Sequence, residues 1–267
     1  MLNAGKRNIV GILVDAVDYE AALDIIFRHA DKGSGIAVSA LAVHGVMTGV
    51  LDAEHKFRLN HFDLLVPDGQ PVRWVLNCLY GTGLSDRVYG PTLMLKVCAR
   101  AAAEGESIYL YGGTPEILSA LVHSLKQRFS GIKIGGAEPS RFRRLIQAEK
   151  TELIERIRKS QASILLCGLG CPRQEVFAFE FRNALPMTIV AVGAAFPFLA
   201  GLIPQAPAWM QDRGLEWLYR LASEPRRLWR RYFYLNPAYL FLVGLQAFRF
   251  KQFPTEGVFP LHEQLFG

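Results

Sequence analysis

One carboxylate, Asp68, stands directly after an apolar run and directly before a glycine in the stretch 63-DLLVPDGQPVRW-74. The apolar run at 62–66 has the pattern of a buried strand, and the Pro-Asp-Gly sequence that follows is typical of the turn that ends one. Ligands of open parallel sheets bind beyond the carboxyl ends of the strands, because the loops there face a crevice and the next helix offers its N-terminus. Asp68 is therefore a candidate ligand-facing residue. The alternative is that Asp68 only shapes the turn or caps the helix that begins near Gln70.

Two other junctions between a predicted strand and a predicted helix are rich in glycine, at 109-YLYGGTPE-116 and 165-LLCGLGCPRQE-175. Glycine lets a ligand approach the backbone closely, and the proline after each pair suits the first turn of a helix. Both junctions therefore suit a phosphate group. The glycines concerned are Gly112, Gly113, Gly168 and Gly170.

The second junction does not match the dinucleotide-binding pattern. G-x-G-x-x-G would need glycine where Arg173 stands, which disfavours a Rossmann-type dehydrogenase. Gln174 and Glu175 follow at once, either as ordinary residues of a first helical turn or as polar groups facing a ligand.

These junctions belong to a regular alternation of strand-like and helical runs. Strands are predicted over 9–14, 36–42, 62–66, 107–111, 132–136, 164–167 and 188–192. Helices are predicted over 19–30, 43–59, 70–79, 91–104, 115–129, 142–160 and 173–184. This alternation predicts an α/β fold with a Rossmann-like, mostly parallel sheet and helices on both faces. We predict a core at 1–205 and a helical, membrane-associating C-terminal appendage at 206–267.

The composition is that of a globular protein, and its positive charge is concentrated near the C-terminus. Of 30 basic and 24 acidic residues, eight basic and two acidic ones lie between Arg213 and Lys251, which leaves 22 of each sign elsewhere. The net charge of +6 therefore comes from this one segment, which predicts an anionic partner there.

The four cysteines show neither a disulfide framework nor the paired spacing of a zinc site, and the first residues do not resemble a signal peptide. There is also no DxD-like run or His/Asp cluster to hold Mg²⁺. We therefore expect a cytoplasmic protein without a metal ion or other cofactor.

Six separated segments, taken in order over roughly residues 10–232, resemble the WecG/TagA/CpsF glycosyltransferases. They are 66-VPDGQPV-72, 87-RVYGP-91, 110-LYGGTPE-116, 168-GLGCPRQE-175, 193-GAAFPFLAG-201 and 214-GLEWLYRLASEPRRLWRR-231. The resemblance implies transfer of a sugar, with inversion, from a nucleotide-diphosphate donor to a polyprenyl-diphosphate-linked glycan in surface or exopolysaccharide synthesis. The donor implied is a UDP-hexose or a UDP-N-acetylhexosamine such as UDP-N-acetylmannosamine.

The resemblance also implies roles for particular residues. Asp68 falls on the family's proposed catalytic base and Arg87 on an arginine of its active-site pocket. Gln174 matches a polar residue beside the donor, and Ser39 stands where the family usually has threonine. The remaining matches are arginines of the C-terminal appendage, thought to close over the donor diphosphate: Arg220, Arg227 and Arg230. On a continuous helix these three would share one face, although Pro225 interrupts the segment. Arginines could then replace a metal ion, because a guanidinium binds phosphate oxygens bidentately.

Three positions depart from the family pattern. The usual Thr-x-Asn reads 39-SAL-41, the usual Phe-Asp-Phe reads 196-FPF-198, and the usual Arg-Ala-Pro reads 205-QAP-207. Leu41, Pro197 and Gln205 therefore predict a donor pocket that need not select the typical base or sugar.

The stretch 232-YFYLNPAYLFLVGLQAFRF-250 is the most apolar in the chain, but its uninterrupted core at 238–245 is too short for a span of about 20 residues. With arginines before it and Arg249 and Lys251 after it, it is typical of an interfacial helix. We expect a peripheral protein at the inner face of the cell membrane. A core-packing helix or a homo-oligomer contact is the alternative.

Two other functions fit parts of the pattern. A non-catalytic α/β module could use the basic and aromatic tail to bind a membrane or single-stranded nucleic acid. We do not expect nucleic acid as a partner, because basic and aromatic residues mix equally well at a bilayer interface. An enzyme that modifies a nucleotide sugar without a lipid acceptor would leave the tail unexplained.

Overall fold

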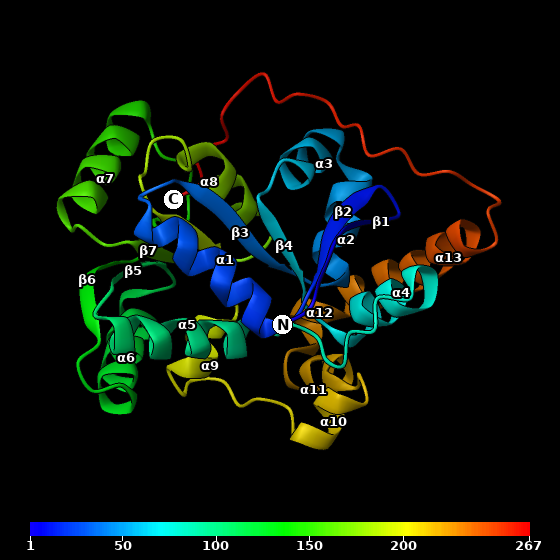
Figure 1. Ribbon diagram of the computed structural model, residues 1–267, viewed down its shortest axis with the longest axis horizontal. Coiled ribbons are helices and arrows are strands. Elements are labelled where there is room, and N and C mark those ends of the chain that lie inside the picture. Colours follow the sequence, from blue (N-terminus) through cyan, green and yellow to red (C-terminus); the bar gives the residue numbers. More distant parts are fainter.

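The structure is a computed structural model that describes the backbone of residues 1–267 and every side chain except those of Arg227 and Arg231. Its centre is a six-stranded parallel sheet in the order β4-β3-β8-β7-β5-β6 (Figure 1). The strands of this sheet are β3 (Ile36–Leu41), β4 (Leu64–Pro67), β5 (Ser107–Gly112), β6 (Lys133–Glu138), β7 (Ile164–Gly168) and β8 (Thr188–Ala191). The predicted α/β fold is confirmed.

Helices cover both faces of the sheet, because its central strands are apolar on both sides. One face packs against α1 (Tyr19–Asp31), α5 (Gly90–Glu104), α6 (Pro115–Arg128) and α9 (Ala195–Leu199). The other face packs against α2 (Val43–Leu51), α3 (Ala53–Asn60), α7 (Gln147–Lys159) and α8 (Arg173–Phe181). Helix α4 (Gln70–Tyr80) follows β4 and contributes to the second core.

The strand predicted at 9–14 is interrupted by a turn. Val10 and Gly11 form the turn of an antiparallel hairpin, in which Ile9 ends β1 (Asn3–Ile9) and residues 12–14 begin β2 (Ile12–Val17). Val10 and Gly11 have φ values of 45° and 95°, so the backbone reverses direction where the apolar run suggested a single extended segment. Both strands contribute side chains to the core, and for that reason the run is apolar.

Two predicted helices also differ. The helix expected at 43–59 is broken at Asp52, whose backbone is extended and whose carboxylate accepts the N–H of His55 (2.9 Å), thereby capping α3. The helix expected from 142 begins only at Gln147. Before it, Arg144 forms a β-bridge with Phe266, a contact that no local pattern could reveal.

The segment after β8 forms short helices beside the carboxyl edge of the sheet (Figure 1). They are α10 (Ala208–Asp212), α11 (Glu216–Ser223), α12 (Pro225–Arg230), a π-helical turn η1 (Arg231–Leu235) and α13 (Asn236–Ala247). The backbone leaves helical geometry at Glu224, directly before Pro225, so Arg220 and Arg230 lie on separate helices and not along one continuous face. None of the helices described is long and apolar enough to cross a membrane.

From α13 the chain returns over α3 to end near α7 and α8 (Figure 1). Hydrogen bonds fix this path along its length. Asn60 Nδ2 donates to the Thr255 carbonyl (2.6 Å), and the carboxylate of Glu180 accepts the N–H groups of Gln264 and Leu265 (2.7 and 3.0 Å). The last residues of the chain are thus tied to α3 and α8.

Candidate active site

Asp68 lies at the carboxyl end of β4, where the chain turns sharply into α4. Gly69 has a φ of 90°, a conformation that side-chain-bearing residues rarely adopt, and the next residue starts the helix. The Pro67 carbonyl accepts the N–H of Val88 (2.9 Å), which brings the start of α5 alongside. The N–H of Gly90, the first residue of α5, donates to the Asp68 carboxylate. Strand end and helix start together place this side chain at the sheet edge.

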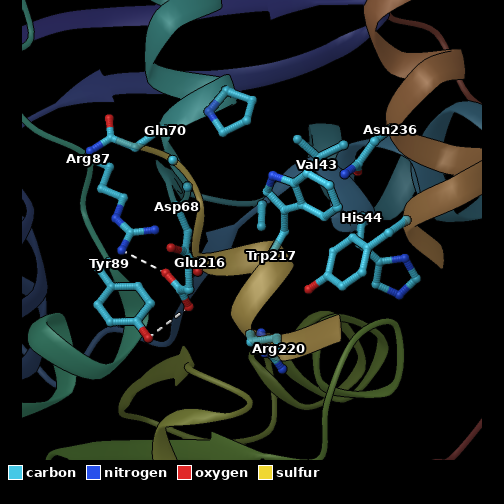
Figure 2. A pocket seen from close by; sticks show the side chains of 15 residues that line it. Val43, His44, Asp68, Gln70, Arg87, Tyr89, Glu216, Trp217, Arg220 and Asn236 are labelled. Carbon is cyan, nitrogen blue, oxygen red and sulfur yellow. Dashed lines mark hydrogen bonds and ion pairs between the residues drawn. The ribbon is translucent and has the colours of Figure 1, made fainter. Parts of the chain in front are cut away.

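Asp68 stands between two adjoining pockets. The strand-end pocket, of about 160 Å³, lies over the ends of β3, β4, β7 and β8 and includes Gly170, Gln174 and Gly193 in its lining. The appendage pocket, of about 110 Å³, lies between the turn after β4 and the C-terminal helices (Figure 2). Four residues line both pockets: Ala42, Asp68, Tyr89 and Arg220. A group passing between ligands in the two pockets would therefore pass Asp68.

Burial raises the pKa of Asp68 from 3.8 to about 6. The positive charge of Arg87 opposes this rise, the negative charge of Glu216 adds to it, and Arg220 opposes it more weakly. The carboxyl group is thus poised to exchange a proton near neutral pH, as a general base requires.

Arg87 joins the segment before α5 to α11 through a buried polar network (Figure 2). Its Nη2 donates to Oε2 of Glu216 (2.8 Å), and the Tyr89 hydroxyl donates to Oε1 of the same carboxylate (3.0 Å). The guanidinium also lies over the Tyr89 ring, 4.2 Å from its centroid. Burial acts to lower the pKa of Arg87, but Asp68 and Glu216 outweigh it and raise the pKa. Arg87 therefore holds α11 against the site and faces Asp68 with a permanent positive charge.

Arg220 reaches back from α11 to the point where the two pockets meet. Its guanidinium lies 5.7 Å from the centroid of the Phe198 ring. Its Nε is buried and has no hydrogen-bond partner among the described residues. An unsatisfied buried donor on a charged group is costly, so this position suits an anionic ligand.

A second buried carboxyl group, Glu175, lines the strand-end pocket. Its Oε1 accepts the Ser39 hydroxyl (2.9 Å) and the Gln174 amide (2.8 Å), while Gln174 Oε1 accepts the N–H of Gly170 (3.2 Å). Burial raises the pKa of Glu175, and the Gln174 and Ser39 contacts oppose the rise. Ser39 itself lies below the lining of the pocket, so it positions Glu175 rather than facing a ligand.

The four predicted glycines have different structural roles. Gly170 faces open space in the strand-end pocket, and a ligand can approach its backbone there. Gly112, Gly113 and Gly168 do not line that pocket. A Cβ on Gly112 would lie 2.7 Å from the carbonyl carbon of Gly168, and one on Gly168 would lie 2.6 Å from the Phe196 ring, so these glycines allow close packing of β5, β7 and α9.

The remaining predicted residues differ in whether they line a pocket. Leu41 lines the strand-end pocket, whereas Pro197 and Gln205 do not line either pocket. Arg230 also lies outside both pockets, with its guanidinium 5.4 Å from the Trp229 ring centroid. The side chain of Arg227 lies outside the part of the chain that the structure describes.

A comparison with known families identifies the family of the chain. The model of the glycosyl transferase WecG/TagA/CpsF family matches residues 7–253 of the 267. The chain belongs to this family. It is therefore a glycosyltransferase of cell-surface polysaccharide synthesis that uses a nucleotide-sugar donor and a glycan acceptor.

Sequence reasoning missed one carboxyl group of this glycosyltransferase, Glu216, and left the role of another, Glu175, open. Glu216 stands within the quoted segment 214–231, but only its pairing with Arg87 and Tyr89, 129 and 127 residues away, shows that it closes the site. Glu175 lies in the first turn of α8 and also lines the strand-end pocket, where it pairs with Ser39 and Gln174. A glutamate directly after Gln174, on a helix starting at a glycine-rich junction, was the available signal.

Proposed function

We propose that the protein transfers a sugar from a nucleotide-diphosphate donor, such as a UDP-hexose or a UDP-N-acetylhexosamine, to a polyprenyl-diphosphate-linked saccharide. The observation that carries this proposal is the position of Asp68, with Arg220 beside it, between two pockets. The donor would occupy the strand-end pocket and the acceptor the appendage pocket. Membership of the family supports the reaction class.

Asp68 would act as the general base. The acceptor hydroxyl attacks the anomeric carbon from the appendage pocket while its proton passes to the Asp68 carboxylate. The bond between that carbon and the diphosphate oxygen breaks on the opposite side, which inverts the anomeric centre. A pKa near 6 leaves Asp68 mostly ionised at pH 7 and still basic enough to take the proton.

Arginines would stabilise the leaving diphosphate. Arg220 has a buried Nε without a partner among the described residues, directly at the pocket junction, and Arg87 adds a second positive charge near Asp68. Guanidinium groups bind phosphate oxygens with charge-assisted hydrogen bonds, and such preorganised charge is a large term in catalysis. No three His, Cys, Asp or Glu side chains among the described residues are grouped to hold a metal ion. The positions of Arg220 and Arg87 support a metal-independent transfer.

Donor contacts would come from Gln174 and the backbone at Gly170. Leu41 presents an apolar side chain to the strand-end pocket where relatives usually have asparagine. A donor group that hydrogen-bonds to the asparagine side chain in those relatives would have no such partner here. Donor preference should therefore differ from that of typical relatives.

The appendage, which we take to begin near residue 206, would hold the protein at the inner face of the cell membrane. Large apolar side chains are exposed along it, including Phe233 (67%), Leu240 (64%) and Phe241 (67%). Basic residues such as Arg230 and Lys251 flank them. Exposed apolar side chains beside cations favour an interfacial position on an anionic bilayer.

The direct test is a matrix of mass-resolved transfer reactions. A panel of UDP- and GDP-sugars is offered with a polyprenyl-diphosphate-linked sugar and, separately, with the same sugar lacking the lipid. We expect one donor class to be used, product only with the lipid-linked acceptor, and no product with Asp68→Asn. Efficient transfer to the lipid-free sugar would contradict the acceptor, and absence of transfer from every donor would contradict the proposed function.

A further inference from the structure

A third cavity, the apolar groove, runs between α4 and the segment from η1 to α13. Its volume is about 600 Å³, within the range of roughly 300–1,000 Å³ that small-molecule sites occupy. Aromatic and aliphatic side chains form most of its walls, and no charged residue is among those that line it in the described structure. Water in such a groove gains few hydrogen bonds, so an apolar ligand would be favoured over it.

The inner end of the groove opens into the appendage pocket. Six residues line both: Val43, Pro71, Gly214, Trp217, Tyr232 and Asn236. Figure 2 shows Trp217 between Asp68 on one side and His44 and Asn236 on the other. A ligand lying in the groove would therefore end beside Asp68 and Arg220.

The outer end of the groove reaches the exposed apolar surface of the appendage. Trp74, Phe233 and Leu240 line the groove and are also 42%, 67% and 64% exposed. Phe241, next along α13, is 67% exposed but does not line it. One apolar path thus leads from the surface that we place against the membrane to the candidate base.

We infer that this groove binds the first isoprene units of the acceptor's lipid carrier, with the attached diphosphate in the appendage pocket near Arg220. This inference rests on the proposed function for the identity of the acceptor. The combination of features selects the occupant: the groove is apolar along its length, it reaches the pocket that holds Arg220 at its inner end, and its outer end lies at the exposed apolar surface that we place against the membrane. A second copy of the chain would explain the apolar walls but not the continuity with the pocket that holds Asp68 and Arg220.

Binding can be measured without any transfer reaction. Trp74 and Trp217 line the groove, so its occupation should change the intrinsic fluorescence. The probes are isopentenyl, farnesyl and geranylgeranyl diphosphate, together with geranylgeraniol and inorganic diphosphate, all below their micelle concentrations. Because each added isoprene unit buries several carbon atoms, we expect Kd to fall on the order of tenfold per unit until the groove is filled. The alcohol and inorganic diphosphate should each bind at least tenfold more weakly than geranylgeranyl diphosphate.

The matched variants are Leu240→Asp and Phe241→Asp. Both replace an exposed apolar residue of α13 with a charge, so both should fold and both should weaken bilayer binding to a similar extent. Only Leu240→Asp places the charge in the groove. We expect it to weaken geranylgeranyl diphosphate binding by 10-fold or more, whereas Phe241→Asp should change it by less than twofold. Circular dichroism checks the fold of each.

Several results would overturn the inference. They are a Kd independent of chain length, equal binding of the alcohol and the diphosphate, equal effects of the two variants, or a dimer in sedimentation that Leu240→Asp dissociates and the isoprenoid does not. If transfer to the lipid-linked sugar fails but chain-length-dependent binding is found, the proposed function falls and the groove assignment stands. If transfer is found but Kd does not depend on chain length, the proposed function stands and the groove assignment falls.

Discussion

The sharpest prediction concerns the pH dependence of catalysis. The pKa of Asp68 is raised to about 6 because the carboxyl group is buried. If Asp68 is the base, kcat/KM should follow its ionised fraction and be about tenfold lower at pH 5 than on the plateau near pH 8. With the ordinary pKa of 3.8, Asp68 would be mostly ionised at pH 5 and the rate would hardly change.

The assay is the initial rate of sugar transfer at low donor concentration from pH 4.5 to 8, with circular dichroism to confirm that the fold persists. Asp68→Asn is nearly isosteric but cannot accept a proton, so its rate should be about 10²–10⁴-fold lower. Its pH–rate profile should also lack the acid limb, which is the fall in rate at low pH. An acid limb near pH 4, or wild-type turnover in Asp68→Asn, would refute the role of Asp68.

The same shift has a consequence for stability. Because the folded-state pKa lies above 3.8, folding favours protonated Asp68, and the stability contributed by the protonated form is lost as the pH rises through about 6. A shift of about two units corresponds to roughly 3 kcal/mol at most. Asp68→Asn should therefore have a higher Tm than the wild type at pH 8, and a large destabilisation instead would mean that the carboxylate is needed for the fold.

Three further predictions concern the charged groups of the site, the two arginines and the metal requirement. Glu216→Gln removes a negative charge that raises the Asp68 pKa, so the acid limb of the pH–rate profile should move to lower pH by about one unit or less. Arg220→Ala removes a positive charge that lowers this pKa, so the acid limb should move to higher pH; shifts of the opposite sign would contradict both expectations. Arg220→Ala should lower kcat/KM by about 100-fold without changing the amount of protein that pellets with liposomes. Arg230→Ala should reduce pelleting with anionic liposomes about fivefold and leave catalysis in detergent nearly unchanged. Equal losses in both assays would make both arginines headgroup contacts. Chelation by EDTA should change the transfer rate by less than about twofold, and abolition followed by rescue with Mg²⁺ or Mn²⁺ would show a metal site instead.

Much of the fold follows from patterns within short stretches of sequence. The parallel strands are apolar because helices cover both of their faces, and the glycine and proline residues between them mark where each strand ends. The Pro-Asp-Gly turn after 62–66 predicts Asp68 at the carboxyl edge of the sheet, and β4 indeed ends one residue before it. Where local sequence carried no information, the predicted elements were wrong, as at the Val10–Gly11 turn and at Arg144, whose bridge partner lies at the far end of the chain.

The candidate site depends on contacts that only the tertiary structure creates. The pKa of Asp68 is raised because the fold buries it, and Glu216 matters because α11 docks beside Arg87 from 129 residues away. Likewise, Gln174 stands next to Glu175 on α8, but the buried hydroxyl of Ser39 completes their network from strand β3. The sequence by itself determined the residue types and the sheet edge they would reach, since periodicity and turn chemistry act over a few residues. Burial, charge pairing and the continuity of the groove with the pocket depend on which distant segments meet, and that was decided by packing alone.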